Sequence, residues 1–355
     1  MDNIKVIQWG LGAMGGGMAR LMLEKKGLEI VAAIDLDPAK VGKDVGEVLE
    51  TGKKAGVKVS GNPDEVFGHV KADLAIIATG SFTKEVFPLI EKAVRAKTNV
   101  ICIAEQMSYP AAQEPELAEK INRLATENGV TVLGTGINPG FVLDTLIIAL
   151  TGVCLDVTKI RAARINDLSP FGPTVMKTQG VGTTPEEFNK GIKDGSIVGH
   201  VGFEESLHMI AAALGWQLDE IKQTREPIIS NVYRETKYVK VEKGNVAGCR
   251  HIAHGYMNGK AVIELEHPQQ VMPNLEGVNT GDYIWIEGTP DISMAIKPEI
   301  PGGLGTIAMA VNMISKVIAA HPGLASMKDL PVPSAVLGDF RKLGFAKQCA
   351  KVSTK

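Results

Sequence analysis

A glycine-rich segment near the start of the chain constrains the fold more than any other feature of the sequence. Gly10, Gly12 and Gly15 fit the pattern GxGxxG between a strand-like run, Ile4–Trp9, and a helical stretch, Met14–Lys26. Strand, glycine turn and helix in this order are typical of the first βα unit of a dinucleotide-binding domain. A glycine turn without a ligand is the alternative, and the flanking strand and helix argue against it.

The three glycines have distinct expected roles. Gly10 permits the tight turn, Gly12 lets the backbone approach a pyrophosphate, and Gly15 allows helix and strand to pack closely. The residues between them lie at the same helix N-terminus. We therefore expect them to contribute to the cofactor site as well: Leu11, Ala13 and Met14.

Asp35 closes a second predicted strand, Glu29–Ile34, about 20 residues after Gly15. A carboxylate at this place accepts hydrogen bonds from the ribose diol of NAD and repels the 2′-phosphate of NADP. Lys40 lies close in the sequence and would partly offset that repulsion. We therefore expect NAD or NADP as the cofactor, with NAD favoured.

The first third of the chain continues to alternate apolar runs with amphipathic helical stretches, which predicts a doubly wound sheet. The run Leu74–Ala78 is typical of a strand buried in a parallel sheet, and Thr79, Gly80 and Ser81 follow it. Ligands bind at the carboxyl ends of such strands, so we expect these three residues to contact the cofactor, with an ordinary turn as the alternative. The predicted fold class is α/β, with an N-terminal Rossmann dinucleotide-binding domain over residues 1–140.

Two polar residues follow later strands at the same predicted edge. Glu105 comes directly after the strand-like run Asn99–Ala104, where a carboxylate near the nicotinamide can act as a base. Asn138 follows the run Val130–Gly134 and is expected near the ring. The alternatives are an acid at a helix N-terminus or a solvated loop charge for Glu105, and a tight loop for Asn138.

The pattern changes after residue 140. A buried helix is expected over Phe141–Gly152, and longer alternating runs then predict an α+β second domain with a mostly antiparallel sheet over residues 141–301. We expect this domain to bind substrate and to form a homodimer. A last helix, Gly305–Ala320, and its tail are expected to pack back on the first domain, so residues 302–355 are assigned to it.

Arg164 and Asn166 lie on the same face of a predicted strand, Val157–Asn166, as Ile160 and Ala162. If this face points inward, the guanidinium of Arg164 needs an anion. A substrate carboxylate and a structural ion pair with a protein acid are both open at this point.

A hairpin signal, Asn258-Gly259, pairs Met257 with Lys260. This register ends an apolar row at His267, places His251 on the opposite face, and gives His267 the following companions: Ile252, His254, Tyr256, Ala261, Ile263 and Leu265. His267 would make a positive pocket with Arg164, or be a satisfied core histidine. Because His251 and His254 are predicted to point to opposite faces, we expect no zinc site.

Composition limits the partners. The chain has 355 residues and a net charge of −2, which provides no general attraction to nucleic acid or an anionic membrane. No uncharged apolar run approaches the ~18 residues of a membrane span, and the four cysteines form no CxxC pair. We expect a cytoplasmic protein with a small-molecule substrate, no bound metal, no nucleic-acid partner and no membrane partner.

Five segments together resemble the 2,4-diaminopentanoate dehydrogenases, a family placed with the dihydrodipicolinate-reductase-like dehydrogenases and related to the NAD(P)-dependent amine dehydrogenases. They are Gly10–Gly15, Ala104–Met107, Gly134–Phe141, Ala163–Asn166 and Gly302–Thr306. The resemblance spans nearly the whole chain. It implies oxidative deamination of the 4-amino group of 2,4-diaminopentanoate to 2-amino-4-oxopentanoate, with release of ammonia, in ornithine degradation.

The resemblance also implies that Glu105 is the catalytic carboxylate. It places Asn138 and Asn166 in the pocket and matches Arg164 and His267 to basic positions suited to a substrate carboxylate. The full set of expected substrate contacts is Asn138, Arg164, Asn166, Phe171 and His267.

At two places the sequence differs from related dehydrogenase families, and these differences limit the activity that the resemblance implies. The stretch Ser169–Lys177 lacks the His-His pair and the KxDxPSGT signature of true dihydrodipicolinate reductases. Gln106 follows Glu105 where sugar dehydrogenases of the Gfo/Idh type usually have lysine. An amine dehydrogenase for simple ketones or aldehydes and a non-catalytic dinucleotide-sensing protein remain as alternatives.

Overall fold

The computed structural model describes residues 2–343, which form two compact units. The first unit comprises the chain up to Phe141 together with the chain from Gly302 onwards, and the second comprises Val142–Pro301. Each unit is built on a large sheet of its own. Cys349 and the rest of the tail after residue 343 lie outside the described residues.

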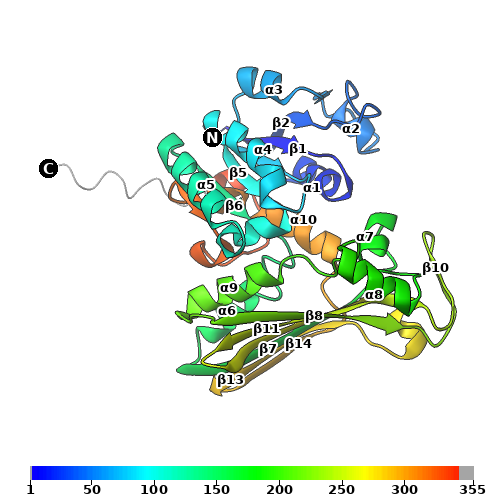
Figure 1. Ribbon diagram of the computed structural model, residues 1–355. Coiled ribbons are helices and arrows are strands. Elements are labelled where there is room, and N and C mark those ends of the chain that lie inside the picture. Colours follow the sequence, from blue (N-terminus) through cyan, green and yellow to red (C-terminus); the bar gives the residue numbers. More distant parts are fainter. Residues whose placement is uncertain (1, 344–355) are drawn as a thin grey trace. The chain divides into compact units, whose positions relative to one another are not determined.

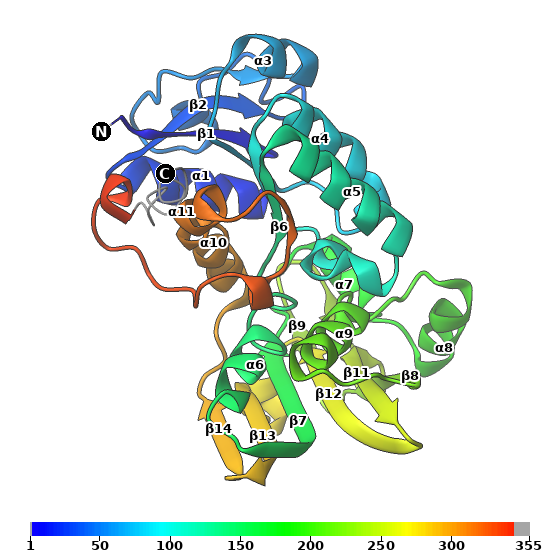
Figure 2. The same cartoon turned by 90° about the vertical axis from the view of Figure 1, so that its left-hand side faces the viewer.

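A seven-stranded parallel sheet forms the centre of the first unit (Figure 2), with the order β15-β6-β5-β4-β1-β2-β3. Its strands are β1 (Ile4–Trp9), β2 (Leu28–Ile34), β3 (Val59–Ser60), β4 (Leu74–Ile77), β5 (Asn99–Cys102), β6 (Thr131–Gly134) and β15 (Gly323–Ala325). The strand order reverses between β1 and β4, and doubly wound folds bind their ligands at such a switch point.

Helices cover both faces of this sheet, with α3, α4 and α5 on one face and α1, α10 and α11 on the other (Figure 2). The helices are α1 (Ala13–Glu24), α2 (Val45–Val48), α3 (Pro63–His69), α4 (Thr83–Arg95), α5 (Pro115–Asn128), α10 (Gly302–Asn312) and α11 (Ile314–Ala319). Short 3-10 turns are η1 (Glu105–Ser108), η2 (Pro110–Ala112), η4 (Met327–Asp329) and η5 (Phe340–Leu343). The predicted α/β fold with a doubly wound N-terminal domain is confirmed.

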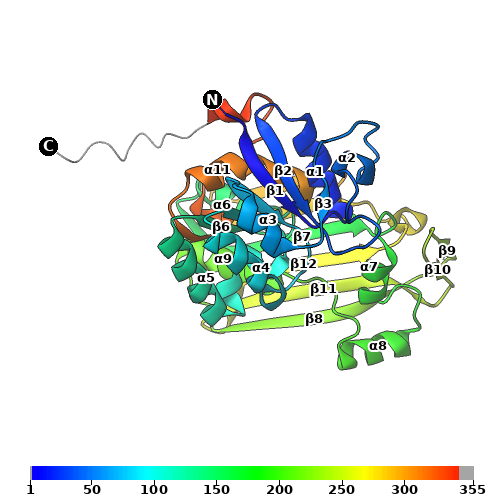
Figure 3. The same ribbon diagram turned by 90° about the horizontal axis from the view of Figure 1, so that it is seen from above.

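A mixed six-stranded sheet with the order β14-β13-β7-β12-β11-β8 forms the second unit. Only β7 and β12 pair in parallel among its described strands, so the prediction of a mostly antiparallel sheet is confirmed. The strands are β7 (Asp156–Asp167), β8 (Glu220–Ile229), β11 (Val246–Met257), β12 (Lys260–Gln270), β13 (Gly281–Thr289) and β14 (Ile292–Ile296). Figure 3 shows β7, β12, β11 and β8 side by side.

The helices of the second unit all lie on one face of this sheet (Figure 1). They are α6 (Thr145–Thr151), α7 (Pro173–Thr178), α8 (Pro185–Asp194) and α9 (Phe203–Leu214). A small ribbon of β9 (Arg234–Glu235) and β10 (Lys240–Val241) and the turn η3 (Pro273–Glu276) complete the unit. Ile160, Ala162, Arg164 and Asn166 of β7 are all buried, which confirms that their shared face points inward.

Two elements differ from the sequence prediction. Strand β8 is absent from the prediction because its inward positions carry the polar side chains of Gln223 and Arg225 and because Pro227 reads as a strand breaker. Helix α6 begins at Thr145 rather than Phe141, since Asp144 caps it by accepting a hydrogen bond from the Thr145 backbone N–H at 2.5 Å.

The longest apolar helical stretch also differs from expectation. Residues Gly302–Ala319 span α10 and α11 and are long and apolar enough, by length and composition alone, to cross a membrane. Helix α10 nevertheless packs against α1 inside the first unit. A Cβ atom at Gly17 would lie 2.2 Å from the Ile307 side chain, which shows how closely the two helices approach. This packing is typical of a core helix in a globular protein.

Candidate active site

The glycine loop between β1 and α1 has the geometry that a dinucleotide phosphate requires. Gly10 has φ +92°, and a Cβ atom there would lie 2.4 Å from the Ala78 carbonyl oxygen at the end of β4. A Cβ at Gly15 would lie 2.0 Å from the Gly10 carbonyl oxygen, whereas a Cβ at Gly12 would meet nothing within 4 Å. The first turn of α1 carries no acidic side chain and its N-cap makes no side-chain hydrogen bond. The loop therefore leaves open space and backbone donors at a helix N-terminus, and it fits a bound pyrophosphate.

This geometry predicts opposite outcomes for two alanine substitutions. Gly12→Ala should leave the unfolding temperature unchanged, because φ is −72° and the Cβ enters open space, but it should weaken NADH binding at least tenfold. Gly15→Ala should lower the free energy of unfolding by about 1–3 kcal/mol, because the Cβ overpacks the turn. Thermal unfolding without cofactor and NADH titration separate the two effects. Equal destabilisation by both substitutions would contradict this division of roles.

Asp35 follows β2 and is held beside the glycine loop. Its carboxylate accepts hydrogen bonds from the backbone N–H groups of Leu11 at 2.8 Å and Asp37 at 2.9 Å, and from the Lys40 ammonium at 3.0 Å. Burial opposes ionisation of Asp35, but these three donors outweigh it and lower the pKa of the carboxyl. Asp35 is therefore an ionised hydrogen-bond acceptor next to the glycine loop, and the Lys40 ammonium forms an ion pair with its carboxylate.

Glu105 opens the turn η1, shortly after β5, and is half-buried. The Ser81 hydroxyl, from the loop after β4, donates a hydrogen bond to the Glu105 carboxylate. Burial raises the pKa of Glu105, the charge of Glu85 raises it further, and the hydrogen bonds from its own backbone N–H and from Ser81 oppose the rise. A carboxyl group with a raised pKa at the carboxyl edge of a parallel sheet is suited to proton transfer.

The loop that carries Asn138 is packed against the C-terminal helix. Thr306 of α10 accepts a hydrogen bond from the Ile137 backbone N–H at 3.2 Å, and a Cβ at Gly305 would lie 2.6 Å from the Ile137 side chain. A Cβ at Gly303 would lie 3.2 Å from the Met14 side chain in the glycine loop. The Gly302–Thr306 segment has no expected ligand, and the structure gives it a packing role against both cofactor-edge loops.

The second unit presents a row of polar side chains across the covered face of its sheet. Strand register places Asp282 opposite Arg164 and His251 opposite both His267 and Arg225. The Arg164 guanidinium binds the Asp282 carboxylate at 2.6 Å and the Ile300 carbonyl oxygen at 2.5 Å. Both side chains of this ion pair are buried. Of the two alternatives that the sequence leaves open for Arg164, the structure contains the ion pair with a protein acid.

The prediction for His251 is wrong because the hairpin contains a β-bulge. The turn pairs Met257 with Lys260 and Tyr256 with Ala261 as predicted, but the register shifts between Gly255 and Tyr256, so that His251 faces His267 and shares its side of the sheet. The same shift places Ile252 opposite Glu266 and His254 opposite Glu264, on the other face from His267. His251 and His254 still point to opposite faces, and the described residues contain no group of three or more possible metal ligands.

Three histidines and Phe203 pack together on this covered face. The His200 ring lies 4.8 Å from the rings of both His267 and Phe203, and Phe203 lies 4.8 Å from His251. Burial lowers the pKa of His200 to about 3 and that of His251 to about 2, and burial with nearby positive groups also holds the pKa of His267 well below its usual range. These imidazoles are therefore neutral at pH 7, unlike the positive pocket expected around His267.

The two remaining expected substrate contacts differ in their surroundings. Asn166 is 4% exposed, and its side-chain oxygen accepts no hydrogen bond from any described residue. A buried carbonyl oxygen without a donor favours a polar ligand or water at this place. Phe171 packs against a small apolar cluster around Leu168 and Met176, so its ring has a structural contact as well.

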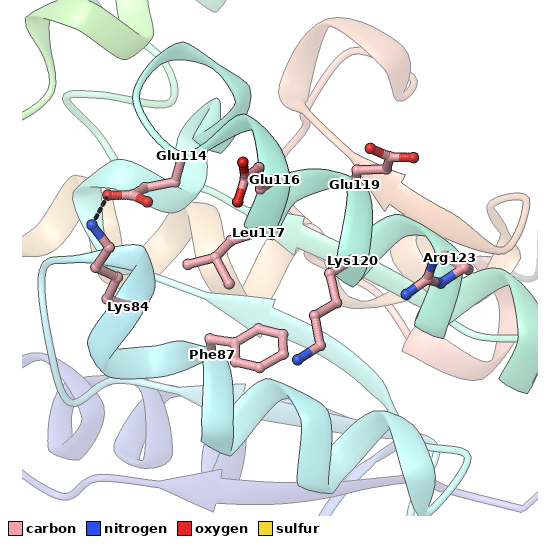
Figure 4. Close-up of a pocket in the computed structure, with 8 residues that line it drawn as sticks. All are labelled: Lys84, Phe87, Glu114, Glu116, Leu117, Glu119, Lys120 and Arg123. Atoms are coloured by element: carbon pink, nitrogen blue, oxygen red, sulfur yellow. Dashed lines mark ion pairs between the residues drawn. The ribbon is translucent and has the colours of Figure 1, made fainter.

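A surface groove lies between α4 and α5, away from the residues considered so far (Figure 4). Its volume is about 690 Å³, and its charged side chains partly satisfy one another. Lys84 pairs with Glu114 at 2.7 Å, and the Lys120 ammonium lies 4.5 Å from the centre of the Phe87 ring. The residues that line the groove include neither Glu105 nor the glycine loop, and the pair of Lys84 with Glu114 joins the first turn of α4 to the segment before α5 at the surface.

The switch-point glycine loop, the ionised Asp35 beside it and Glu105 at the carboxyl edge of the sheet define the class of this protein: it is an NAD(P)-dependent dehydrogenase of the Rossmann type. Residues 4–107 match the family described as dihydrodipicolinate reductase, N-terminus, and residues 141–345 match the 2,4-diaminopentanoate dehydrogenase C-terminal domain. The chain belongs to the 2,4-diaminopentanoate dehydrogenase family.

Similar proteins agree with this assignment. A 2,4-diaminopentanoate dehydrogenase from Acetoanaerobium sticklandii is 51% identical over 97% of this chain and 98% of its own length. An amine dehydrogenase from Streptomyces virginiae is 26% identical over 94% of this chain and 98% of its own length. Among solved structures, an amine dehydrogenase from Mycobacterium smegmatis has a TM-score of 0.84 at 27% identity and covers 94% of this chain and 98% of its own.

Proposed function

We propose that the chain catalyses the NAD(P)⁺-dependent oxidative deamination of the 4-amino group of 2,4-diaminopentanoate, giving 2-amino-4-oxopentanoate and ammonia, in ornithine degradation. One observation carries the proposal: in a chain of this family, the half-buried carboxylate of Glu105 lies at the carboxyl edge of the cofactor-binding sheet and is bonded to the Ser81 hydroxyl of the loop after β4. Such a group can take protons from an amine that lies beside the cofactor.

The first chemical step needs a neutral amine. Glu105 takes one proton from the 4-ammonium group, because only the free lone pair can push electrons towards the departing hydride, and then passes that proton to solvent. When bound, NAD(P)⁺ accepts the hydride from C4. The products of this step are an iminium group on the substrate and one released proton.

The second step is hydrolysis of the iminium. Glu105 accepts a proton from water as the water oxygen attacks C4, and it returns this proton to the nitrogen as the C–N bond breaks. The carbinol hydroxyl loses its remaining proton as the ketone forms, and the released ammonia takes up this proton and leaves as ammonium. One carboxylate therefore serves both steps, provided that its pKa permits it to exchange protons at the working pH.

We propose that Asn138, Asn166, Phe171 and His267 contact the substrate. The buried, unsatisfied oxygen of Asn166 supports its part of this assignment. Because Arg164 is engaged by Asp282 and by the Ile300 carbonyl, we assign it to the support of the second sheet rather than to the substrate carboxylate.

The Lys40 ammonium should control the use of NADP. Asp35 is the acceptor for the ribose diol, so a 2′-phosphate would lie beside Lys40, which is 3.0 Å from Asp35 and 3.5 Å from Asp37. Lys40→Met should weaken NADPH binding roughly tenfold through loss of one charged hydrogen bond and leave NADH binding within about twofold. Titration with both cofactors measures the ratio, and Lys43→Met is the matched control. If Lys40→Met weakened the binding of NADH and NADPH equally, Lys40 would not be the residue that favours NADP.

An amine dehydrogenase for simple ketones or aldehydes is the second candidate function, because relatives at 26% and 27% identity are named amine dehydrogenases. A reduction screen with NAD⁺ and NADP⁺ over 2,4-diaminopentanoate, 2,5-diaminohexanoate and simple amines separates the two. We expect the 4-amino acid to give the highest kcat/KM. Equal rates with amines that lack a carboxylate would favour the second candidate, and no amine-dependent reduction would favour a dinucleotide sensor.

We further propose a cytoplasmic homodimer formed through the uncovered face of the second sheet. On that face the rings of Tyr283 and Trp285 stack at 5.8 Å, and the Arg161 guanidinium lies 5.1 Å from the Trp285 ring. Half-buried aromatic side chains with an arginine are typical of protein interfaces. The molar mass of the full chain in solution tests the assembly.

A further inference from the structure

The loop between β4 and α4 is clamped on both sides. The Glu85 carboxylate accepts hydrogen bonds from the backbone N–H groups of Ser81 at 3.3 Å and Phe82 at 3.4 Å. On the other side, the Gln106 backbone N–H donates to the Ser81 carbonyl at 3.1 Å, and the Gln106 side-chain oxygen accepts from the Thr83 backbone N–H at 2.9 Å. The position of Ser81 is therefore fixed by one residue of α4 and one residue of η1.

Gly80 makes the approach of Glu85 possible. A Cβ atom at Gly80 would lie 2.7 Å from the Glu85 carboxylate oxygen, so any larger residue would displace that side chain. In the first turn of α4, Lys84 pairs with Glu114 at 2.7 Å (Figure 4). The charge of Lys84 is therefore paired with Glu114, while the Glu85 carboxylate binds the loop.

Ser81 connects this clamp to the proposed base. Its hydroxyl is bonded to the Glu105 carboxylate, while its backbone N–H is bonded to Glu85. We propose that Glu85 is a positioning residue for the reaction: it fixes the Gly80–Phe82 loop so that the Ser81 hydroxyl holds the Glu105 carboxylate in place for proton transfer. This inference rests on the proposed function and extends it to a residue that touches neither substrate nor cofactor.

The groups around Glu105 shift its pKa, and this shift can be measured. Glu85 is the charged group on α4 that faces Glu105, and the nearby thiol of Cys102 on β5 is neutral because burial raises its pKa to about 12. Strands β4 and β6 carry no titratable side chain. Burial and the Glu85 charge raise the pKa of Glu105, whereas the Ser81 hydroxyl lowers it.

Two substitutions should therefore move the pH profile in opposite directions. The rate falls as pH falls through the pKa of Glu105, because the protonated carboxyl cannot act as a base. Glu85→Gln keeps an acceptor oxygen but removes the charge, so the acid limb should move to lower pH with the plateau of kcat within about twofold of the unmodified chain. Ser81→Ala removes the hydrogen bond to the ionised form, so the limb should move to higher pH, with kcat/KM lowered roughly tenfold.

Further variants distinguish a positioning role of Glu85 from a general loss of the fold. Glu85→Ala loses both the charge and the acceptor and should lower the plateau of kcat about tenfold, a loss that Glu85→Gln rescues. Glu91→Gln on the same helix removes a carboxylate that pairs with Arg95 and should not move the profile. Thermal unfolding of each variant shows that the fold is intact.

A direct titration keeps this test independent of the proposed function. The ¹³C resonance of the Glu105 carboxyl, assigned by its loss in Glu105→Gln, is followed against pH in the full chain without cofactor or substrate. The Glu105 midpoint should move to lower pH in Glu85→Gln and to higher pH in Ser81→Ala. An unchanged Glu105 titration in both variants would overturn the inference, even if the chain proves inactive towards 2,4-diaminopentanoate.

Discussion

Glu105→Gln is expected to lower kcat by about 10²–10⁴-fold while leaving the binding of NADH unchanged. Glutamine keeps the size of the side chain and can accept the Ser81 hydrogen bond, but it cannot take a proton from an amine or from water. The unfolding temperature above the Glu105 pKa should be equal to or higher than that of the unmodified chain. Burial raises the pKa of Glu105, so the ionised form costs folding stability at high pH, and the substitution removes that cost.

Single-turnover kinetics and NADH titration measure the two halves of this prediction. Glu116→Gln is the matched control, because Glu116 is exposed at the start of α5 in the surface groove of Figure 4 and should leave kcat unchanged. A Glu105→Gln variant that turns over within tenfold of the unmodified chain would remove Glu105 from the chemistry.

Arg164→Met is expected to lower the free energy of unfolding by about 3–5 kcal/mol, because it leaves the buried Asp282 carboxylate without its partner. Burial raises the pKa of Asp282, and the Arg164 guanidinium and the Ile300 N–H oppose that rise. Once Arg164 is removed, the Ile300 N–H, at 2.9 Å, is the hydrogen-bond donor that the described residues still offer to this carboxylate. Urea unfolding of the full chain gives the loss directly.

A paired substitution distinguishes the ion pair from a substrate contact. Arg164→Met combined with Asp282→Leu removes both charges and should recover most of the lost stability. If Arg164 instead bound the substrate carboxylate, Arg164→Met would fold normally and raise KM sharply for 2,4-diaminopentanoate but not for simple amines. That result would contradict the structural role assigned to Arg164.

The cofactor half of the molecule could be predicted from the sequence because its signals are local. The glycine spacing, Asp35 after β2 and Glu105 after β5 each depend on a strand end and a few following residues, and each stands where the pattern predicts. The doubly wound order itself follows from the alternation of apolar runs and helical stretches. Glu85 could also have been found locally, because an acid in the third helical position is a capping signal.

The second unit was harder to predict because its site depends on register between distant strands. One extra residue near Val262 shifts the hairpin and moves His251 beside His267, and no local signal marks that bulge. The partner of Arg164 lies on β13, far along the chain, so an inward arginine reads equally well as an anion-binding or an ion-paired residue. The lowered pKa values of the histidines likewise arise from burial, which the strand pattern alone does not give.

Product identification tests most directly whether the chain oxidises the C4 amine of a diamino acid. The full chain is incubated with 2,4-diaminopentanoate and NAD⁺, and the products are identified by NMR and mass spectrometry together with the ammonia released. We predict 2-amino-4-oxopentanoate, with one ammonia and one NADH formed per substrate, and at least about a hundredfold less product from Glu105→Gln in the same time. Deamination at C2, or reduction of NAD⁺ without release of ammonia, would contradict the proposed reaction.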